Sequence, residues 1–240
     1  MKLTPDSKFM QLCGKFVALF KINFLWLLCS VPLVTLGAST CAMLTALTAL
    51  RREEDCGAKA FFGAFRRYFG KATVLWLLMA FAGAVLALDY RLVAYMDFPG
   101  RMAVIVLICF CILALVLVAG LIFPLLVRYP GTVRDTVVNA VLLSIAHLPK
   151  MLLVTAMNLL PALVLVVLPQ VFVLLSFLWP ICGFALIALY DLTVTDKIFA
   201  ALEQPDPEAQ SPDGELAPKE RTPGQKSTFC QTPAGVKIDP

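Results

Sequence analysis

Histidine and charged residues are scarce in this sequence. Only one of its 240 residues is histidine, His147, and Lys, Arg, Asp and Glu together make up 15% of the chain. The eight cysteines contain no C-x-x-C pair, and neither a P-loop nor a GxGxxG motif occurs. Cys109 and Cys111 lie inside an apolar run, where thiols behave as small hydrophobic groups. We therefore expect no catalytic, cofactor-binding or metal-ligating residues, and we do not expect an enzyme.

Hydrophobic residues, by contrast, make up 60% of the chain, and the mean hydropathy is +0.85. This composition exceeds what a water-soluble surface tolerates and predicts an all-α, multi-pass bundle of membrane helices. The runs without a charged residue are 22–50, 72–88, 102–127 and 151–190. Because one span needs roughly 20 residues, the last run predicts two spans, which meet at Pro169-Gln170.

The first run, 22–50, is too long for one span and contains Pro32 and Gly37 near its middle. As a single helix it would measure about 44 Å at about 1.5 Å per residue, against a hydrocarbon core of about 30 Å. Tilt accommodates this difference poorly. The alternatives are one long helix, which gives five spans, and a hairpin that turns at 31–37, which gives about six membrane segments.

The distribution of basic residues favours the hairpin. With it, every Lys and Arg except Arg91 and Arg101 falls on the cytoplasmic side, as the positive-inside rule requires, whereas the five-span alternative leaves more of them outside. Both termini are then cytoplasmic. The second arm, 37–50, is short enough either to span the membrane or to re-enter it. A cleaved signal peptide is disfavoured because Lys21 interrupts the early apolar stretch.

An amphipathic segment at 58–70 follows the hairpin. Its aromatic and basic residues recur at helical spacing on two different faces. The aromatic face carries Phe61, Phe65 and Phe69, and the basic face carries Lys59, Arg66 and Arg67. This pattern predicts a helix that lies flat in the cytoplasmic interface with its aromatic side chains in lipid. A surface that docks a partner protein would show the same spacing.

A second segment between basic residues, 128–150, has a similar plan. Thr132 and Asp135 match the start of a capping box. Lys71 and Lys150 occupy corresponding places in the two segments, as an internal repeat of the kind found in transporters would place them. Similarity of composition between apolar helices explains the correspondence equally well.

Few polar residues are expected to lie within the membrane, and their type bears on whether the protein is a transporter. Asn23, Asn158 and Gln170 are uncharged, and hydrogen bonds between helices are the favoured role for them. Four charged residues near the run ends are expected to reach water: Asp89, Arg91, Asp191 and Asp196. An ion-coupled carrier is expected to place a carboxylate near the midplane, so this distribution argues against one.

The C-terminal residues differ from the rest of the chain in composition. Residues 203–240 are rich in proline and charge and poor in aliphatic clusters, so they cannot bury enough surface to fold alone. We therefore divide the chain into a helical membrane domain, 1–202, and a disordered cytoplasmic tail, 203–240.

The segment 23–47, with its charged turn, the FFGAFRRYFGKAT stretch and the later FPLLVRYPGTVRDTVVNAVLLSIAHLPK, resembles the YesL family of bacterial membrane proteins. The residues that carry the resemblance are Leu25, Trp26, Leu27, Cys29, Ser30, Pro32, Gly37, Ala38 and Ser39. The resemblance implies no catalytic residues, because the molecular activity of that family is not established. It implies a context instead, since such proteins are typically encoded beside genes for carbohydrate ABC transport and polysaccharide use.

Two functions follow from these observations. The first is a non-enzymatic accessory or regulatory protein linked to carbohydrate uptake of the ABC type, with the lipid bilayer and permease subunits as its partners. The second is a small-solute transporter or channel, which the broken hairpin and the repeat-like plan of the two segments favour. Nucleic acid is not an expected partner, because the basic segments also carry apolar faces and fit a phosphate-rich lipid surface better. The sequence leaves the oligomeric state open.

Overall fold

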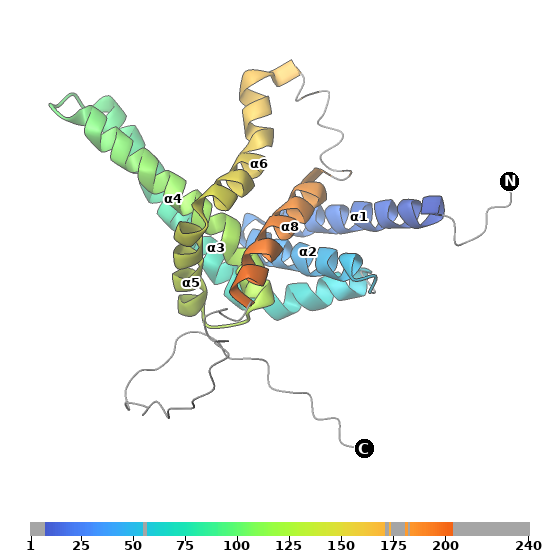
Figure 1. Ribbon diagram of the computed structural model, residues 1–240. Coiled ribbons are helices and arrows are strands. Elements are labelled where there is room, and N and C mark those ends of the chain that lie inside the picture. Colours follow the sequence, from blue (N-terminus) through green and yellow to red (C-terminus); the bar gives the residue numbers. More distant parts are fainter. Residues whose placement is uncertain (1–7, 55–56, 171–172, 174–180, 182, 204–240) are drawn as a thin grey trace, which may run out of the picture. The chain divides into compact units, whose positions relative to one another are not determined.

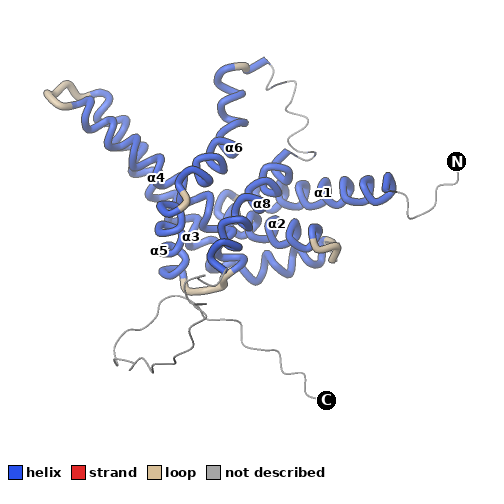
Figure 2. The backbone as a smooth tube through the Cα atoms, viewed as in Figure 1, coloured by secondary structure: helices blue, strands red, loops and turns tan. Residues whose placement is uncertain are grey.

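The computed structural model describes residues 8–54, 57–170, 173, 181 and 183–203, and within these residues the chain is helical and contains no strand (Figures 1 and 2). The chain divides into two units, Met1–Ala201 and Leu202–Pro240. The first unit is an all-α polytopic membrane bundle. The predicted tail, 203–240, lies outside the described residues except for Glu203.

The helices of the first unit that the structure describes follow one another along the chain, and those from α1 to α6 are joined by short connections. In chain order they are α1 (Lys8–Ser30), the 3-10 turn η1 (Leu33–Thr35), α2 (Leu36–Arg51), α3 (Ala58–Tyr95), α4 (Arg101–Arg128), α5 (Val133–Ala146), α6 (Leu148–Val167) and α8 (Phe184–Glu203). Within the described residues, five stretches are long and apolar enough to cross a membrane: Cys13–Ser30, Leu33–Arg51, Ala58–Tyr95, Arg101–Arg128 and Leu148–Val167. The predicted sixth segment lies partly outside the described residues and ends in α8.

The predicted break in the first apolar run is confirmed. Helix α1 ends two residues before Pro32, and α2 begins after η1. The Thr35 hydroxyl donates to the carbonyl oxygen of Cys29 at 2.6 Å and closes the turn. Two further hydrogen bonds join the arms, Trp26 Nε1 to Thr40 Oγ1 at 3.3 Å and Ser30 Oγ with Ser39 Oγ at 2.7 Å. The two arms therefore form an antiparallel hairpin.

Helix α2 is the inner helix of the bundle. Nine of its 16 residues are buried inside the protein, against five of 38 in α3 and seven of 28 in α4. It lies between α1 and the first part of α3 (Figure 1). Small side chains permit this close packing, and at Gly37 the backbone comes so near that an added Cβ would overlap the carbonyl oxygen of Ala72.

The predicted amphipathic segment 58–70 is the first part of the continuous helix α3 rather than a separate element. Its buried stripe runs through Phe61, Ala64, Tyr68, Ala72 and Leu75. Phe61 is fully buried in the protein, so the expectation that it inserts into lipid is wrong. The reason is that α2 covers this stripe of α3.

The other residues named for this segment divide between two environments. Phe65 is half-buried against the core, and Phe69 is 42% exposed. The three basic residues of the segment are exposed, namely Lys59, Arg66 and Arg67. The position of this part of α3 relative to a bilayer stays a prediction.

Two boundaries predicted from proline and capping patterns are confirmed. Thr132 caps α5, since its Oγ1 accepts from the backbone N–H of Asp135 at 3.2 Å. Helix α6 ends at Val167, two residues before Pro169, as the missing N–H and the ring of a proline require. The run 151–190 is therefore divided near its middle.

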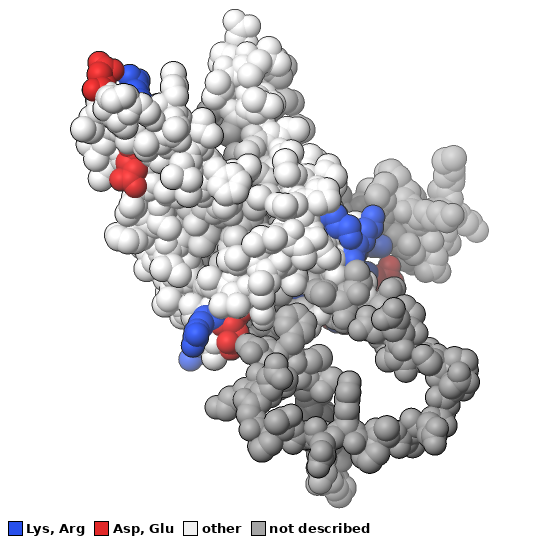
Figure 3. All heavy atoms as spheres, turned by 60° about the vertical axis from the view of Figure 1, so that its left-hand side comes forward, with Lys and Arg blue, Asp and Glu red and all other residues white. Residues whose placement is uncertain are grey.

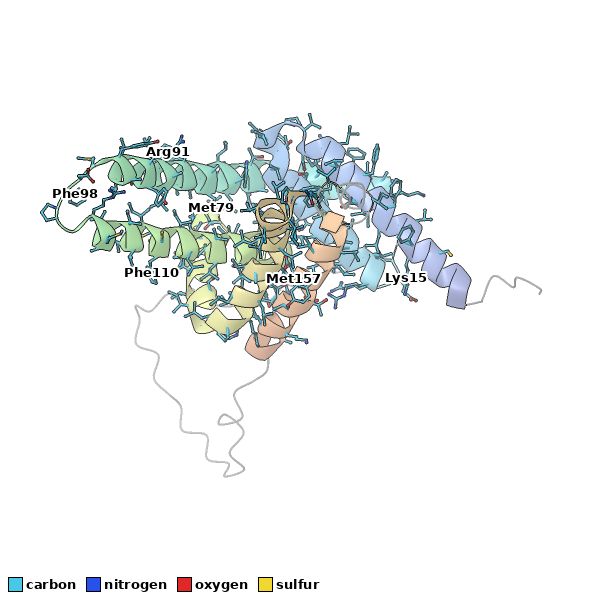
Figure 4. The ribbon with its side chains drawn as sticks, turned by 90° about the horizontal axis from the view of Figure 1, so that it is seen from above. Lys15, Met79, Arg91, Phe98, Phe110 and Met157 are labelled. Atoms are coloured by element: carbon cyan, nitrogen blue, oxygen red, sulfur yellow. The ribbon has the colours of Figure 1, made fainter. Side chains whose placement is uncertain are left out.

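Charged side chains gather toward two ends of the visible face, with a wide uncharged surface between them (Figure 3). At one end Arg101 pairs with Asp97 at 3.0 Å beside the α3–α4 loop. Arg91 and Phe98 lie toward this loop, far from Lys15 (Figure 4). Lys15 itself pairs with Glu53 at 3.2 Å. This grouping of charges matches the division that the basic residues predict, while its orientation toward the cytoplasm stays a prediction.

Candidate ligand cavity around Asp191

Asp191 is the charged residue that the sequence interpretation placed wrongly. We expected it to reach water at the end of the last helix, but it is buried, with 9% of its surface exposed. Spacing along α8 explains its position. Phe184, Ile187, Ala188 and Asp191 recur at helical intervals and line one cavity, so the carboxylate continues a stripe that faces the bundle.

A hydrogen bond from α6 holds one oxygen of this carboxylate. Asn158 Nδ2 donates to Asp191 Oδ2 at 2.8 Å, and the same amide group donates to the carbonyl oxygen of Val154 at 2.9 Å. Asp191 Oδ1 is also buried and has no hydrogen-bond partner among the residues that the structure describes. Half of the acceptor capacity of a buried carboxylate is thus unused, which is costly unless a ligand completes it.

Asp191 lines an open cavity of about 310 Å³. Side chains from α1, α2, α4, α6 and α8 line it, and these are elements that Figure 1 shows converging in the middle of the first unit. Most of the lining is aliphatic or aromatic, including Met43, Leu44, Phe123 and Ile187. A cavity of this size with a few polar groups in an apolar lining has the properties of a small-molecule site.

The polar and aromatic groups of the lining come from all five helices. Trp26 of α1 packs against Phe184 of α8, with ring centroids 4.7 Å apart. Its indole N–H is engaged by Thr40 of α2. Thr155 of α6 presents a buried Oγ1 that has no partner within the described part of the chain. Asp191 is the one charged residue among the described residues that line the cavity.

Asn23 of α1 positions the helix that carries Asp191. Its side chain is fully buried, and Oδ1 accepts from the backbone N–H of Ala185 at 3.0 Å. Backbone donors in the first turn of a helix have no acceptor within that helix, so Asn23 satisfies one of them. The expectation that Asn23 and Asn158 bond between helices is confirmed, whereas Gln170 is exposed.

Asp196, five residues beyond Asp191, lies in a different environment. It accepts from Arg51 at 2.7 Å and from Arg128 at 3.2 Å, and all three side chains are partly exposed. With Thr48 and Arg52 they line an open hollow of about 220 Å³. Exposed ion pairs each contribute at most about 1 kcal/mol, so this cluster joins the ends of α2 and α4 to α8 without dominating stability.

The residues that carry the family resemblance converge on the hairpin and reach the cavity. Ala38 and Ser39 are fully buried, while Leu25 and Cys29 pack partly against the core. Trp26 belongs to both places, because it bonds to the second arm and lines the cavity. Hydrogen bonds of Trp26, Ser30 and Ser39 hold the two arms of the hairpin together, and Trp26 also forms part of one wall of the cavity.

Sequence reasoning missed three contributors to the site, Thr40, Thr155 and Asp191. For Asp191 the sequence does contain a signal, because its helical spacing places it on one stripe with Phe184 and Ala188. Within the described residues no three His, Cys, Asp or Glu side chains converge as metal ligands. The cavity offers a carboxylate, an amide and two hydroxyls, which are groups that bind a solute.

The helices and the cavity define an all-α polytopic membrane protein with a buried polar centre. Residues 19–90 match a family model described as a protein of unknown function, DUF624. The match covers the end of α1, the whole of α2 and most of α3, and it includes the resemblance residues from Leu25 to Ser39 but not the later stretch 123–150. Neither the curated proteins nor the solved structures contain a match to the chain.

Proposed function

We propose that this protein is a small-solute transporter whose binding site is the Asp191 cavity, and that it is not an enzyme. The single observation that carries the proposal is the buried Asp191 carboxylate, which lines a cavity among five helices and has one oxygen without a partner among the described residues. Ionisable residues inside membrane proteins are expensive to bury and generally mark a pathway or a ligand site.

This observation removes the main sequence-based reason against transport. The interpretation from sequence rested on the expectation that all four acidic and basic residues near the run ends reach water. Asp191 is instead buried in the bundle, so the sequence-based argument that every such charge reaches water does not hold for it. The cost of burying an unpaired charge is several kcal/mol, which supports a ligand that offsets it.

The experiment is solute flux in proteoliposomes made with the full chain. Uptake of labelled amines, amino acids and monosaccharides is compared with uptake by protein-free liposomes. We expect at least one class to enter at a rate that depends on the protein, and Asp191→Asn to reduce this rate about tenfold or more. Asp196→Asn, on the same helix but outside the cavity, is the matched control and should leave flux within about twofold. Uptake equal to that of protein-free liposomes for every class would contradict transport.

The resemblance favours a second candidate function. In that alternative the chain is a member of the YesL family and an accessory or regulatory component of carbohydrate ABC uptake in the cell membrane. The match of residues 19–90 to the family of unknown function is compatible with this membership. The test is co-purification: an accessory protein should retain permease subunits after mild solubilisation, and a chain that purifies without them would weaken this candidate.

A further inference from the structure

We propose that the Asp191 cavity takes a small organic cation, with its ammonium group against Asp191 Oδ1 and its apolar body against the aromatic lining. This inference rests on the proposed function and names the substrate class of the same site. It follows from the charge, the hydrogen-bonding capacity and the apolar character of the lining.

The charge of the lining selects a cation. Asp191 is the one charged residue that the described lining contains, so the described cavity has no basic group to neutralise it. Arg51 of α2 and Arg128 of α4 contact α8, and both already pair with Asp196. Asp196 lies five residues farther along α8, about 7.5 Å at about 1.5 Å per residue. A cationic ligand supplies the missing counter-charge, whereas an anion would be repelled.

The unused hydrogen-bond acceptors suit an ammonium group. An ammonium carries three donors and no acceptor. Asp191 and Thr155 both line the cavity, and each has a buried side-chain oxygen that lacks a partner among the described residues and can accept from an ammonium N–H. A bare metal ion fits less well, because Ca²⁺ needs six to eight oxygen ligands and the side-chain oxygens of the described lining come from only four residues: Thr40, Thr155, Asn158 and Asp191.

The remainder of the lining suits an apolar body. Trp26 and Phe184 form an aromatic pair on one wall, and aromatic faces attract a cation within about 6 Å of the ring centroid. Phe123 and Leu44 line the cavity from α4 and α2. A sugar would leave most of its hydroxyl groups without partners in such a lining, whereas the phenyl or alkyl body of an amine would not.

The test is a binding measurement on the full chain in lipid nanodiscs, with empty nanodiscs subtracted to remove partition into lipid. Three probes of one shape but different charge are phenethylammonium, 2-phenylethanol and phenylacetate. We expect phenethylammonium to bind at least tenfold more tightly than the alcohol, and phenylacetate to bind most weakly. Asp191→Asn should remove the preference for the cation, while Asp196→Asn should keep it.

A second variant guards against a folding defect in Asp191→Asn. Ala188 lines the cavity three residues before Asp191, and Ala188→Met adds volume there without changing charge. It should weaken the cation and the alcohol by similar factors, because both occupy the same space. Each variant is first compared with the unmodified chain by its thermal unfolding midpoint.

The outcomes separate this inference from the function on which it rests. Equal binding of cation and alcohol, reduced alike by Ala188→Met, would overturn the cationic substrate class and leave the cavity as a solute site. Cation preference that persists in Asp191→Asn would overturn the role of Asp191. Binding of none of the probes would overturn the inference, while protein-dependent flux of another solute class would still support transport.

Discussion

Gly37→Ala should destabilise the hairpin packing on which the whole bundle depends. A Cβ at this position would overlap the carbonyl oxygen of Ala72 and lie 2.8 Å from Cβ of Trp76. Neither atom can rotate away, since one is backbone and the other is the first atom of its side chain. Helices α2 and α3 must therefore move apart, which weakens the extensive contact between them.

The expected magnitude combines two opposing effects. Overpacking costs about 1–3 kcal/mol, and contact with a rigid backbone places this site near the upper end. Alanine in place of glycine in a helix recovers about 1 kcal/mol. The net loss is then about 2 kcal/mol, which corresponds to a fall in the unfolding midpoint of roughly 4–8 °C for a chain of this size. Tryptophan fluorescence during heating of the detergent-solubilised protein measures it.

Gly70→Ala is the matched control on the neighbouring helix. An added Cβ there meets no atom within 4 Å, so only the helix preference should act and the midpoint should rise by roughly 2–4 °C. The two glycine variants are thus expected to change stability in opposite directions. A Gly37→Ala protein that gained stability as Gly70→Ala does would refute the close packing of α2 against α3.

Three further predictions concern other parts of the molecule. Asn23→Leu should cost about 1–3 kcal/mol in thermal unfolding, because the backbone N–H of Ala185 loses its acceptor while still buried; an unchanged midpoint would contradict that role. Asp196→Ala should cost no more than about 2 kcal/mol, with a smaller effect at high salt, since its two ion pairs are partly exposed; a larger loss that salt does not change would be inconsistent with this. Single cysteines at Arg52 and Asp97 should react with a membrane-impermeant reagent from opposite sides of the membrane, because these positions belong to the two charged ends; labelling of both from one side would exclude the six-segment topology.

The elements set by chain length and by proline were predictable from sequence. Pro32 lies in a run too long for one span, and Pro169 divides a run long enough for two, so the breaks follow from local chemistry. The cap at Thr132 is equally local, because the hydroxyl oxygen and the backbone N–H of Asp135 from which it accepts are three residues apart. Such features depend on the residues themselves and not on what packs against them.

The sequence could not predict whether the apolar stripe of residues 58–70 faces lipid or another helix of the same chain. The spacing of Phe61, Phe65 and Phe69 indicates an apolar stripe, but the same stripe can face lipid or another helix. The structure covers Phe61 with α2, and nothing in the segment itself specifies this choice. Asp191 was misplaced for a related reason, since its burial depends on Asn158 in α6, a helix that the sequence alone does not position against α8.

The measurement that tests the central claim most directly is a structure of the full chain in nanodiscs, determined by electron cryo-microscopy in the presence of phenethylammonium. We predict density for the probe within hydrogen-bond distance of Asp191 Oδ1, inside the cavity bounded by Trp26 and Phe184, and no such density for Asp191→Asn under the same conditions. Empty density beside a buried Asp191 at saturating probe, or an Asp191 side chain that points into water, would contradict the assignment of this cavity as the binding site.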